Sequence, residues 1–283
     1  MTANGHKSQN RLLEFAIFIA FFWVFVHLLT SRWAYLWNVI VSGVMALAAV
    51  VLVCSPLLRG KQDSRRIWAL LSALAAGFWV FNLFRYVGLV EWPLSHPVDL
   101  AAYLRLLYSH FVFSITVLAP VLVACQAAGA VRMISWGNWK RGIFARPGKT
   151  ILVLVSVGCW FWAVWVVLST KLDLPGPFMA FVTICLLKAF LTGATEEICY
   201  RGIIQPSAIA RFGVPLGIIM QSCLYTVFHI HLGEAFFSRV GFLAGVMVLG
   251  LVFGLVTHFT RGIGWAVVIH IAINVVIEWS NLS

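Results

Sequence analysis

Long apolar stretches, each close to the length of a membrane-spanning helix, follow one another along the chain. One span needs about 20 predominantly apolar residues, and the polar breaks between these stretches are short. The pattern predicts an all-α, polytopic transmembrane helical bundle of about nine spans, with eight as the alternative. The predicted spans cover residues 12–30, 34–58, 67–84, 108–131, 151–169, 178–210, 214–231, 240–259 and 265–279.

Two stretches interrupt this pattern. Residues 85–107 contain Pro93 and Pro97 among polar side chains, and we expect an interfacial or re-entrant element there. Residues 132–150 combine several basic side chains with two tryptophans. This second stretch predicts an amphipathic loop that lies on anionic lipid headgroups.

Composition agrees with a membrane protein and excludes a soluble one. The chain is 62% hydrophobic and only 10% charged, whereas about a quarter of the residues in soluble domains are charged. Its net charge of +11 comes largely from basic residues in short loops, such as 59–66 and 132–149, so it does not indicate nucleic-acid binding. By the positive-inside rule these loops predict a cytoplasmic N-terminus, and we expect a multi-pass protein of the bacterial cytoplasmic membrane.

Ionisable groups inside an apolar span are the strongest functional signal in the chain. Glu196, Glu197 and Arg201 lie in the middle of the span 178–210, where charged groups are expensive and usually mark a site. Arg201 follows Glu197 by four residues, so a bidentate ion pair between them is expected. Glu196 then points elsewhere without a cation, which suits a general base. The sequence thus assigns different roles to the two glutamates.

The geometry of a helical hairpin supplies a partner for Glu196. The turn falls near Gly213, which is 17 residues after Glu196 and 16 residues before His229. In an antiparallel hairpin these two positions meet at the same depth, roughly 25 Å from the turn. Tyr225 lies one turn before His229 on the same face. The spacing predicts a glutamate beside a histidine inside the bilayer.

The last span adds a second polar pair, His270 and Asn274, on one helix face. A glutamate–histidine pair can activate a water molecule, and a histidine with an amide can stabilise an oxyanion. Two other side chains are alternatives with weaker roles. Cys199 is a candidate nucleophile, and Lys188, two turns before Glu196 and near its face, is expected to snorkel or to line the cavity without a catalytic role.

The three motifs Glu-Glu-x-x-x-Arg, aromatic-x-x-x-His and His-x-x-x-Asn, in this order on late spans, resemble the CPBP family of intramembrane proteases. That family includes type II CAAX prenyl endopeptidases, bacteriocin-processing proteins and Abi proteins. The resemblance covers roughly residues 176–279, with the tyrosine at position 225 where the family usually has phenylalanine. It predicts a protease core at 176–283, built from the last four helices, and leaves residues 1–175 as transmembrane helices of unassigned role.

The resemblance implies a glutamate-dependent intramembrane endopeptidase. Glu196 and His229 would activate water, and His270 and Asn274 would form the oxyanion hole. Three further residues of the motifs would support the site without direct chemistry: Glu197, Arg201 and Tyr225.

The cofactor prediction is none. Zinc bound through Glu196, His229 and His270 is the alternative, and it is disfavoured because the chain lacks the His-Glu-x-x-His spacing of zinc proteases. Predicted partners are the lipid bilayer and a membrane-associated protein or peptide, such as a CaaX-like substrate, a leader peptide or a C-terminal sorting tail. The alternatives are a non-catalytic immunity or regulatory protein of the same fold and, less favoured, a proton-coupled transporter. The sequence leaves open the membrane face of the site and the oligomeric state.

Overall fold

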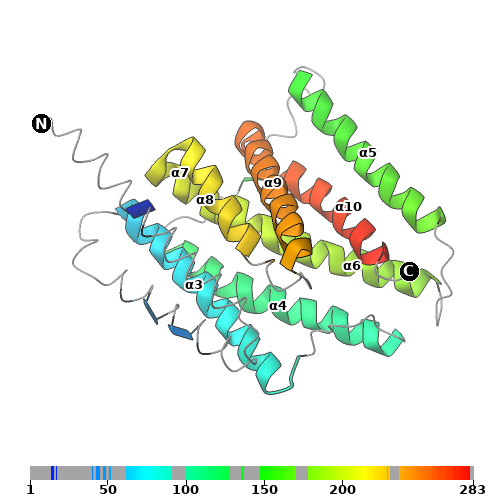
Figure 1. Cartoon of the computed structure of the whole chain (residues 1–283), viewed down its shortest axis with the longest axis horizontal. Coiled ribbons are helices and arrows are strands. Elements are labelled where there is room, and N and C mark those ends of the chain that lie inside the picture. The colour runs from blue at the N-terminus through cyan, green and yellow to red at the C-terminus, as the bar shows by residue number, and fades with distance from the viewer. Residues whose placement is uncertain are drawn as a thin grey trace, which may run out of the picture.

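The computed structural model describes the helical core of the chain, and every regular element within the described residues is a helix. In chain order these are α3 (Gln62–Tyr86), α4 (Leu100–Ala127), α5 (Pro147–Ser169), α6 (Phe178–Glu196), η3 (Glu197–Ile204), α7 (Gln205–Phe212), α8 (Val214–Val227), α9 (Phe236–Thr260) and α10 (Gly264–Ser280). Figure 1 shows them as one bundle. The described residues are 62–90, 100–127, 135–136, 147–169, 178–227, 229, 236–280 and isolated positions between 14 and 51.

Five of the described helical stretches are long and apolar enough to cross a membrane, and α8 and α10 are shorter apolar helices. The protein is therefore a polytopic integral membrane protein, as its hydrophobic pattern predicts. Most of the first two predicted spans and most of the basic loop 132–150 lie outside the described residues. The total number of spans, the orientation of the N-terminus and a bacterial membrane stay predictions.

Two helix boundaries differ from the sequence prediction. α4 begins at Leu100, so residues 100–107 are helical and not part of an irregular element. Here Tyr103 and Leu106 face the core while Arg105 is exposed, and this amphipathic arrangement accommodates the polar residues in the helix. α8 ends at Val227 instead of residue 231, and the His229 amide donates to the Thr226 carbonyl in a turn.

The predicted span 178–210 is one apolar helical stretch, Phe178–Phe212, with a change of winding in its middle. Residues Glu197–Ile204 form a π-helix, and the Gln205 amide donates to the carbonyl of Tyr200, five residues earlier. Pro206 follows at once and has no amide hydrogen to continue an α-helical ladder. A uniform α-helical rotation of about 100° per residue is therefore wrong beyond Glu196. π-helical segments within α-helices are frequent at functional sites.

This long stretch is the centre of the bundle. α3 and α4 pack on one side of it, α8, α9 and α10 on the other, and α5 lies outside α10 (Figure 1). The largest described apolar core joins residues of α3 and α4 to Ile203, Ile204 and Ala208 from the central stretch and to Met220 and Leu224 from α8. The N-terminal helices and the predicted protease core thus share apolar packing, and the division near residue 175 stays a prediction.

α9 approaches the central stretch and α8 closely through two glycines, Gly254 and Gly250. Gln205 donates a 2.8 Å hydrogen bond to the Gly254 carbonyl, and Gln221 donates one of 2.9 Å to the Gly250 carbonyl. A Cβ at position 254 would lie 2.6 Å from the Gln221 amide nitrogen. Small residues and amide side chains commonly hold membrane helices together in this way.

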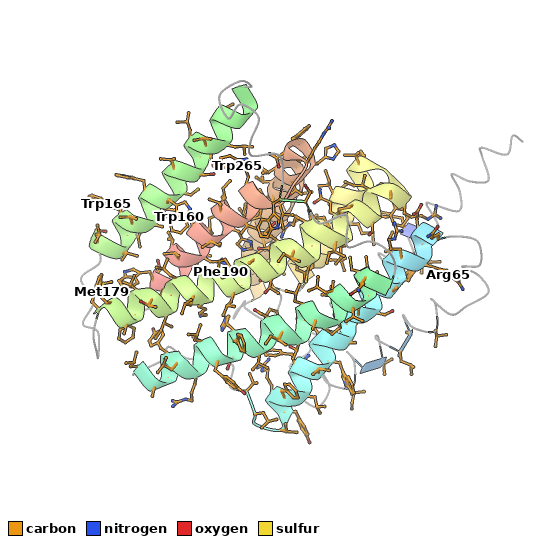
Figure 2. All side chains as sticks on the ribbon, turned by 180° about the vertical axis from the view of Figure 1, so that it is seen from behind. Arg65, Trp160, Trp165, Met179, Phe190 and Trp265 are labelled. Carbon is orange, nitrogen blue, oxygen red and sulfur yellow. The ribbon has the colours of Figure 1, made fainter. Side chains whose placement is uncertain are left out.

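The outer helix α5 shows the opposite character. The α5 side chains Trp165 and Leu168 are 62% and 72% exposed. Large apolar side chains of α6 are also exposed, and Met179 is 68% exposed (Figure 2). Exposed apolar side chains on membrane helices are suited to lipid contact. The polar groups are instead gathered inside the bundle, where α6, α8 and α10 meet.

Candidate active site

The predicted site residues converge at the junction of α6 and η3. Glu196 ends α6, Glu197 begins η3, His229 follows α8, and His270 lies on α10. The Nε2 atoms of both histidines face the same carboxylate oxygen, Oε2 of Glu196, at 3.8 Å for His229 and 3.6 Å for His270. The hairpin register therefore predicts the Glu196–His229 approach correctly.

Glu197 forms the predicted ion pair with Arg201. Arg201 Nη1 lies 2.9 Å from Glu197 Oε1, and both side chains are fully buried. The expected bidentate geometry is wrong, because this single contact is the only one between the two groups that meets hydrogen-bond criteria in the described part of the chain. Removing either partner would leave an uncompensated charge in the bundle.

Glu197 has a second role that its sequence position does not reveal. The same Oε1 atom lies 2.8 Å from Nδ1 of His270. Because Oε1 accepts from Arg201 and a carboxylate oxygen can accept a second hydrogen bond, Nδ1 of His270 is the donor. Glu197 thus fixes the ring of His270 and directs its Nε2 toward Glu196.

His229 is oriented by the backbone. Its Nδ1 lies 2.8 Å from the Tyr225 carbonyl, which can only accept, so Nδ1 carries the proton. In the neutral ring, Nε2 then has a free lone pair directed at Glu196. The ring also packs at a tilt of 54° against the Tyr225 ring, with centroids 4.5 Å apart.

Glu196 differs from Glu197 in having no arginine in direct contact, although Oε2 of Glu197 is also buried without a hydrogen-bond partner among the described residues. Oε2 of Glu196 is likewise buried and has no hydrogen-bond partner within the described part of the chain. The separations from the two imidazole nitrogens are too long for direct hydrogen bonds, but they suit a water molecule held between the three groups. Buried polar atoms without a partner are rare in folded proteins, and catalytic sites are one of the places where they occur.

Aromatic rings enclose Arg201. Its guanidinium carbon lies 4.1 Å from the Tyr225 ring centroid and 5.4 Å from that of Phe253 on α9. Phe253 also lies 5.2 Å from the His270 ring. Phe253 was not predicted as a site residue, because an apolar side chain in an apolar helix carries no signal. The Tyr225 hydroxyl lies 3.4 Å from Nε2 of His270, a contact that a phenylalanine could not provide.

Asn274 lies one turn beyond His270, beside Gly193 of α6. A Cβ at position 193 would lie 3.6 Å from the Asn274 amide nitrogen and 3.5 Å from the backbone nitrogen of Ile271. Gly193 is thus a point of close approach between α6 and α10. This places Asn274 next to the turn of α6 that leads into Glu196.

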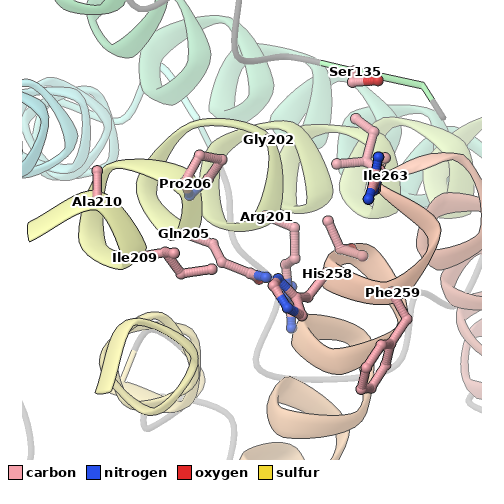
Figure 3. A pocket seen from close by; sticks show the side chains of 13 residues that line it. Ser135, Arg201, Gly202, Gln205, Pro206, Ile209, Ala210, His258, Phe259 and Ile263 are labelled. Atoms are coloured by element: carbon pink, nitrogen blue, oxygen red, sulfur yellow. The ribbon is translucent and has the colours of Figure 1, made fainter. Parts of the chain in front are cut away.

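A pocket of about 580 Å³ lies behind the site, between η3–α7 and the connection from α9 to α10 (Figure 3). It is lined by Arg201 and Gln205 on one side and by His258 and Gly262 on the other, and by none of the four predicted catalytic residues. The Gly262–Gly264 turn is therefore level with Arg201 and not with Gly213. Because this turn lies deep in the bundle, His270 reaches Glu197 although α10 begins only six residues earlier.

The structure also describes the surroundings of Cys199 and Lys188, the two residues to which the sequence assigns weaker roles. Cys199 is 1% exposed within the apolar core, which is the environment of a structural cysteine. Lys188 is buried and forms an ion pair with Glu278 of α10. A carboxylate on the neighbouring helix thus provides a partner for Lys188, and the expectation that it snorkels or lines the cavity stays a prediction.

The donor set was compared with that of a metal site. Two imidazole nitrogens and one carboxylate oxygen converge, and each histidine is held through its other nitrogen, as metal-bound histidines often are. Among the described residues, however, no three His, Cys, Asp or Glu side chains form a group that could hold a metal ion. The donors are of the types that bind zinc, and metal dependence stays a prediction.

Comparison with known proteins agrees with the motifs. Residues 178–276 match the model of the family described as type II CAAX prenyl endopeptidase Rce1-like. No curated protein and no solved structure matches the chain. The matched range contains Glu196, His229, His270 and Asn274, and it begins with the first residue of α6. The part of the chain that carries the site is therefore similar to the Rce1-like family of type II CAAX prenyl endopeptidases, which supports the resemblance to the CPBP family.

Proposed function

We propose that the protein is a glutamate-dependent endopeptidase that hydrolyses a peptide bond in a membrane-associated substrate. The observation that carries this proposal is the unpartnered Oε2 atom of Glu196, which faces two imidazole nitrogens at 3.6 and 3.8 Å within the described part of the chain. A water molecule between these groups can give one hydrogen bond to Glu196 and one to His229. Its lone pair then remains available for attack on a carbonyl carbon.

The reaction would proceed in two steps. The water oxygen bonds to the scissile carbonyl carbon while Glu196 takes one of the water protons, which gives a tetrahedral oxyanion. The carbon–nitrogen bond then breaks, and Glu196 passes that proton to the leaving amine. Glu196 thus acts as base and afterwards as acid, and it returns to its starting state.

The oxyanion requires a donor, which we assign to His270 together with Asn274. Nδ1 of His270 already donates to Glu197, so Nε2 can donate only if the ring is an imidazolium. Its positive charge would balance Glu196, as Arg201 balances Glu197. The site would then hold two carboxylates and two cations, a neutral set that can persist inside a bilayer.

Substrate classes follow from the membrane setting and the family. A prenylated CaaX-type peptide is the first choice, and a leader peptide or a C-terminal sorting tail are the others. The test is cleavage of three quenched fluorescent peptides, one of each class, by the purified protein in liposomes. We expect one class to be cleaved at least about tenfold faster than the others. No cleavage of any peptide would favour a non-catalytic membrane protein of the same fold.

Metal dependence is tested in the same assay. Activity of the glutamate mechanism should persist after exhaustive treatment with a chelator such as 1,10-phenanthroline. The matched control is a non-chelating phenanthroline isomer at the same concentration. Activity that is lost with the chelator alone and restored by zinc would replace this mechanism with a metal mechanism in which Glu196, His229 and His270 are ligands.

A further inference from the structure

A second charged pair lies on the helices that form the site. Lys188 of α6 and Glu278 of α10 are in direct contact, and their side chains are only 9% and 19% exposed. α4 adds polar surroundings, because His110 interacts electrostatically with Lys188, and Tyr103 does so with Glu278. The proposed chemistry uses neither member of this pair.

Each member of this pair is separated from a site residue on its own helix by the same number of residues. Lys188 precedes Glu196 by eight residues on α6, and His270 precedes Glu278 by eight residues on α10. Eight residues span about 12 Å of helix, slightly more than two turns. Because α6 and α10 pack against each other and run in opposite directions, the two contacts lie at matching distances along both helices.

Between the Lys188–Glu278 pair and the site, α6 and α10 approach closely at Gly193. Gly193 allows Ile271 and Asn274 to approach α6, and a Cβ there would lie 3.3 Å from Cγ1 of Ile271. The α6–α10 contact therefore has a polar connection at each end and a close approach in the middle. A shift of α10 along α6 would break both polar connections together.

We infer that Lys188 and Glu278 are positioning residues that set the register of α10, so that His270 and Asn274 face Glu196. An apolar contact alone defines the register of two helices poorly in lipid, because lipid chains are as apolar as the side chains. An ion pair between buried groups has one favourable alignment, and setting register is the best-attested role of buried polar groups. The activity part of this inference rests on the proposed function.

The test uses Lys188→Met, Glu278→Gln and the exchange variant Lys188→Glu with Glu278→Lys, each as full-length protein in liposomes. The first measurement is the ¹⁵N spectrum of the His270 ring, assigned by its absence in His270→Gln. We expect the signal of Nδ1, which donates to Glu197, to shift in both single variants and to return to its original position in the exchange variant. This measurement needs no substrate.

The second measurement is cleavage of the peptide that the unmodified protein prefers. We expect kcat to fall about ten- to a hundredfold in the single variants with KM nearly unchanged, and to recover in the exchange variant. If the unmodified protein cleaves no peptide, the proposed function fails, and the histidine spectrum still decides the positioning role. If a single variant does not fold, the exchange variant decides: a folded protein with a displaced His270 signal contradicts the inference.

Glu14→Gln is the matched control. Glu14 pairs with Arg211 at the end of α7, and the side chains are 13% and 14% exposed, a burial similar to that of Lys188 and Glu278. We expect this variant to lower thermal stability without moving the His270 signal. An unchanged signal in Lys188→Met and Glu278→Gln, or an equal shift in Glu14→Gln, would overturn the inference.

Discussion

The carboxylates at the two ends of the α6–α10 contact have different partners. At one end, Glu278 meets Lys188 directly, and both charges are compensated. At the other end, Glu197 accepts from Arg201 and His270, while Oε2 of Glu196 has no partner among the described residues. Buried charges that are fully paired hold helices together. Glu197 thus has Arg201 in direct contact, whereas Glu196 has only the two imidazoles, at 3.6 and 3.8 Å, and the proposed function uses this second carboxylate as the base.

The largest expected effect on stability comes from Glu197→Gln. Arg201 is fully buried, and the loss of its charged partner leaves an unpaired guanidinium in the bundle. We expect a loss of about 3–5 kcal/mol in the free energy of unfolding, together with loss of cleavage. Thermal unfolding in detergent measures the first effect, and the double variant Glu197→Gln with Arg201→Met should recover part of the stability without recovering activity.

Stability of Glu197→Gln equal to that of the unmodified protein would contradict a structural role for this ion pair. It would also remove the distinction between the two glutamates.

Gly193→Ala should have an intermediate effect. The added Cβ would lie 3.3 Å from Cγ1 of Ile271 and 3.5 Å from its backbone nitrogen, so Ile271 has to shift by a few tenths of an ångström, and we expect α10 to shift with it. Overpacking of this kind typically lowers stability by about 1–3 kcal/mol. We expect a matching fall in kcat, measured with the preferred peptide, because His270 and Asn274 move with α10.

Gly158→Ala is the control for that variant. A Cβ at this position of α5 has nothing within 4 Å among the described residues, so the substitution changes helix propensity alone. Stability should stay the same or rise by up to about 1 kcal/mol, with activity unchanged. Equal losses in both variants would show that the α6–α10 distance is not important.

The smallest expected effect is that of Tyr225→Phe. The ring keeps its 4.1 Å contact with the Arg201 guanidinium, and the substitution removes only the hydroxyl, which lies 3.4 Å from His270 Nε2 and also interacts with the Glu196 side chain. We expect kcat to change by about threefold or less, since a hydrogen bond of this length contributes little. Steady-state kinetics measures this change, and a loss of about a hundredfold would make the hydroxyl part of the catalytic machinery.

Residue spacing was sufficient to predict the Glu196–His229 approach. The hairpin turns at Gly213, which adopts a positive φ of 89°, and its two arms have nearly equal length, so depth follows from counting residues. The Glu197–Arg201 pair followed from its four-residue spacing. Both predictions involve residues that are close in sequence or joined by one tight turn.

Contacts made by α10 could not be predicted in the same way. They depend on the depth of the Gly262–Gly264 turn and on the rotation of α10, which packing decides and a residue count does not. The Glu197–His270 hydrogen bond and the π-helix are therefore new in the structure. The sequence did contain one signal: Glu278 follows His270 and Asn274 at four-residue steps, which places a third polar residue on the same face of an apolar helix.

Glu196→Gln decides whether Glu196 is the base that activates water. The substitution keeps the size of the side chain and removes its charge, while the Glu197–Arg201 and Glu197–His270 contacts do not depend on it. The measurement is kcat for the preferred peptide, together with thermal unfolding of the same sample. We predict a fall of about 10²–10⁴-fold in a protein that is as stable as the unmodified one. Cleavage that survives in the folded variant would contradict this role for Glu196.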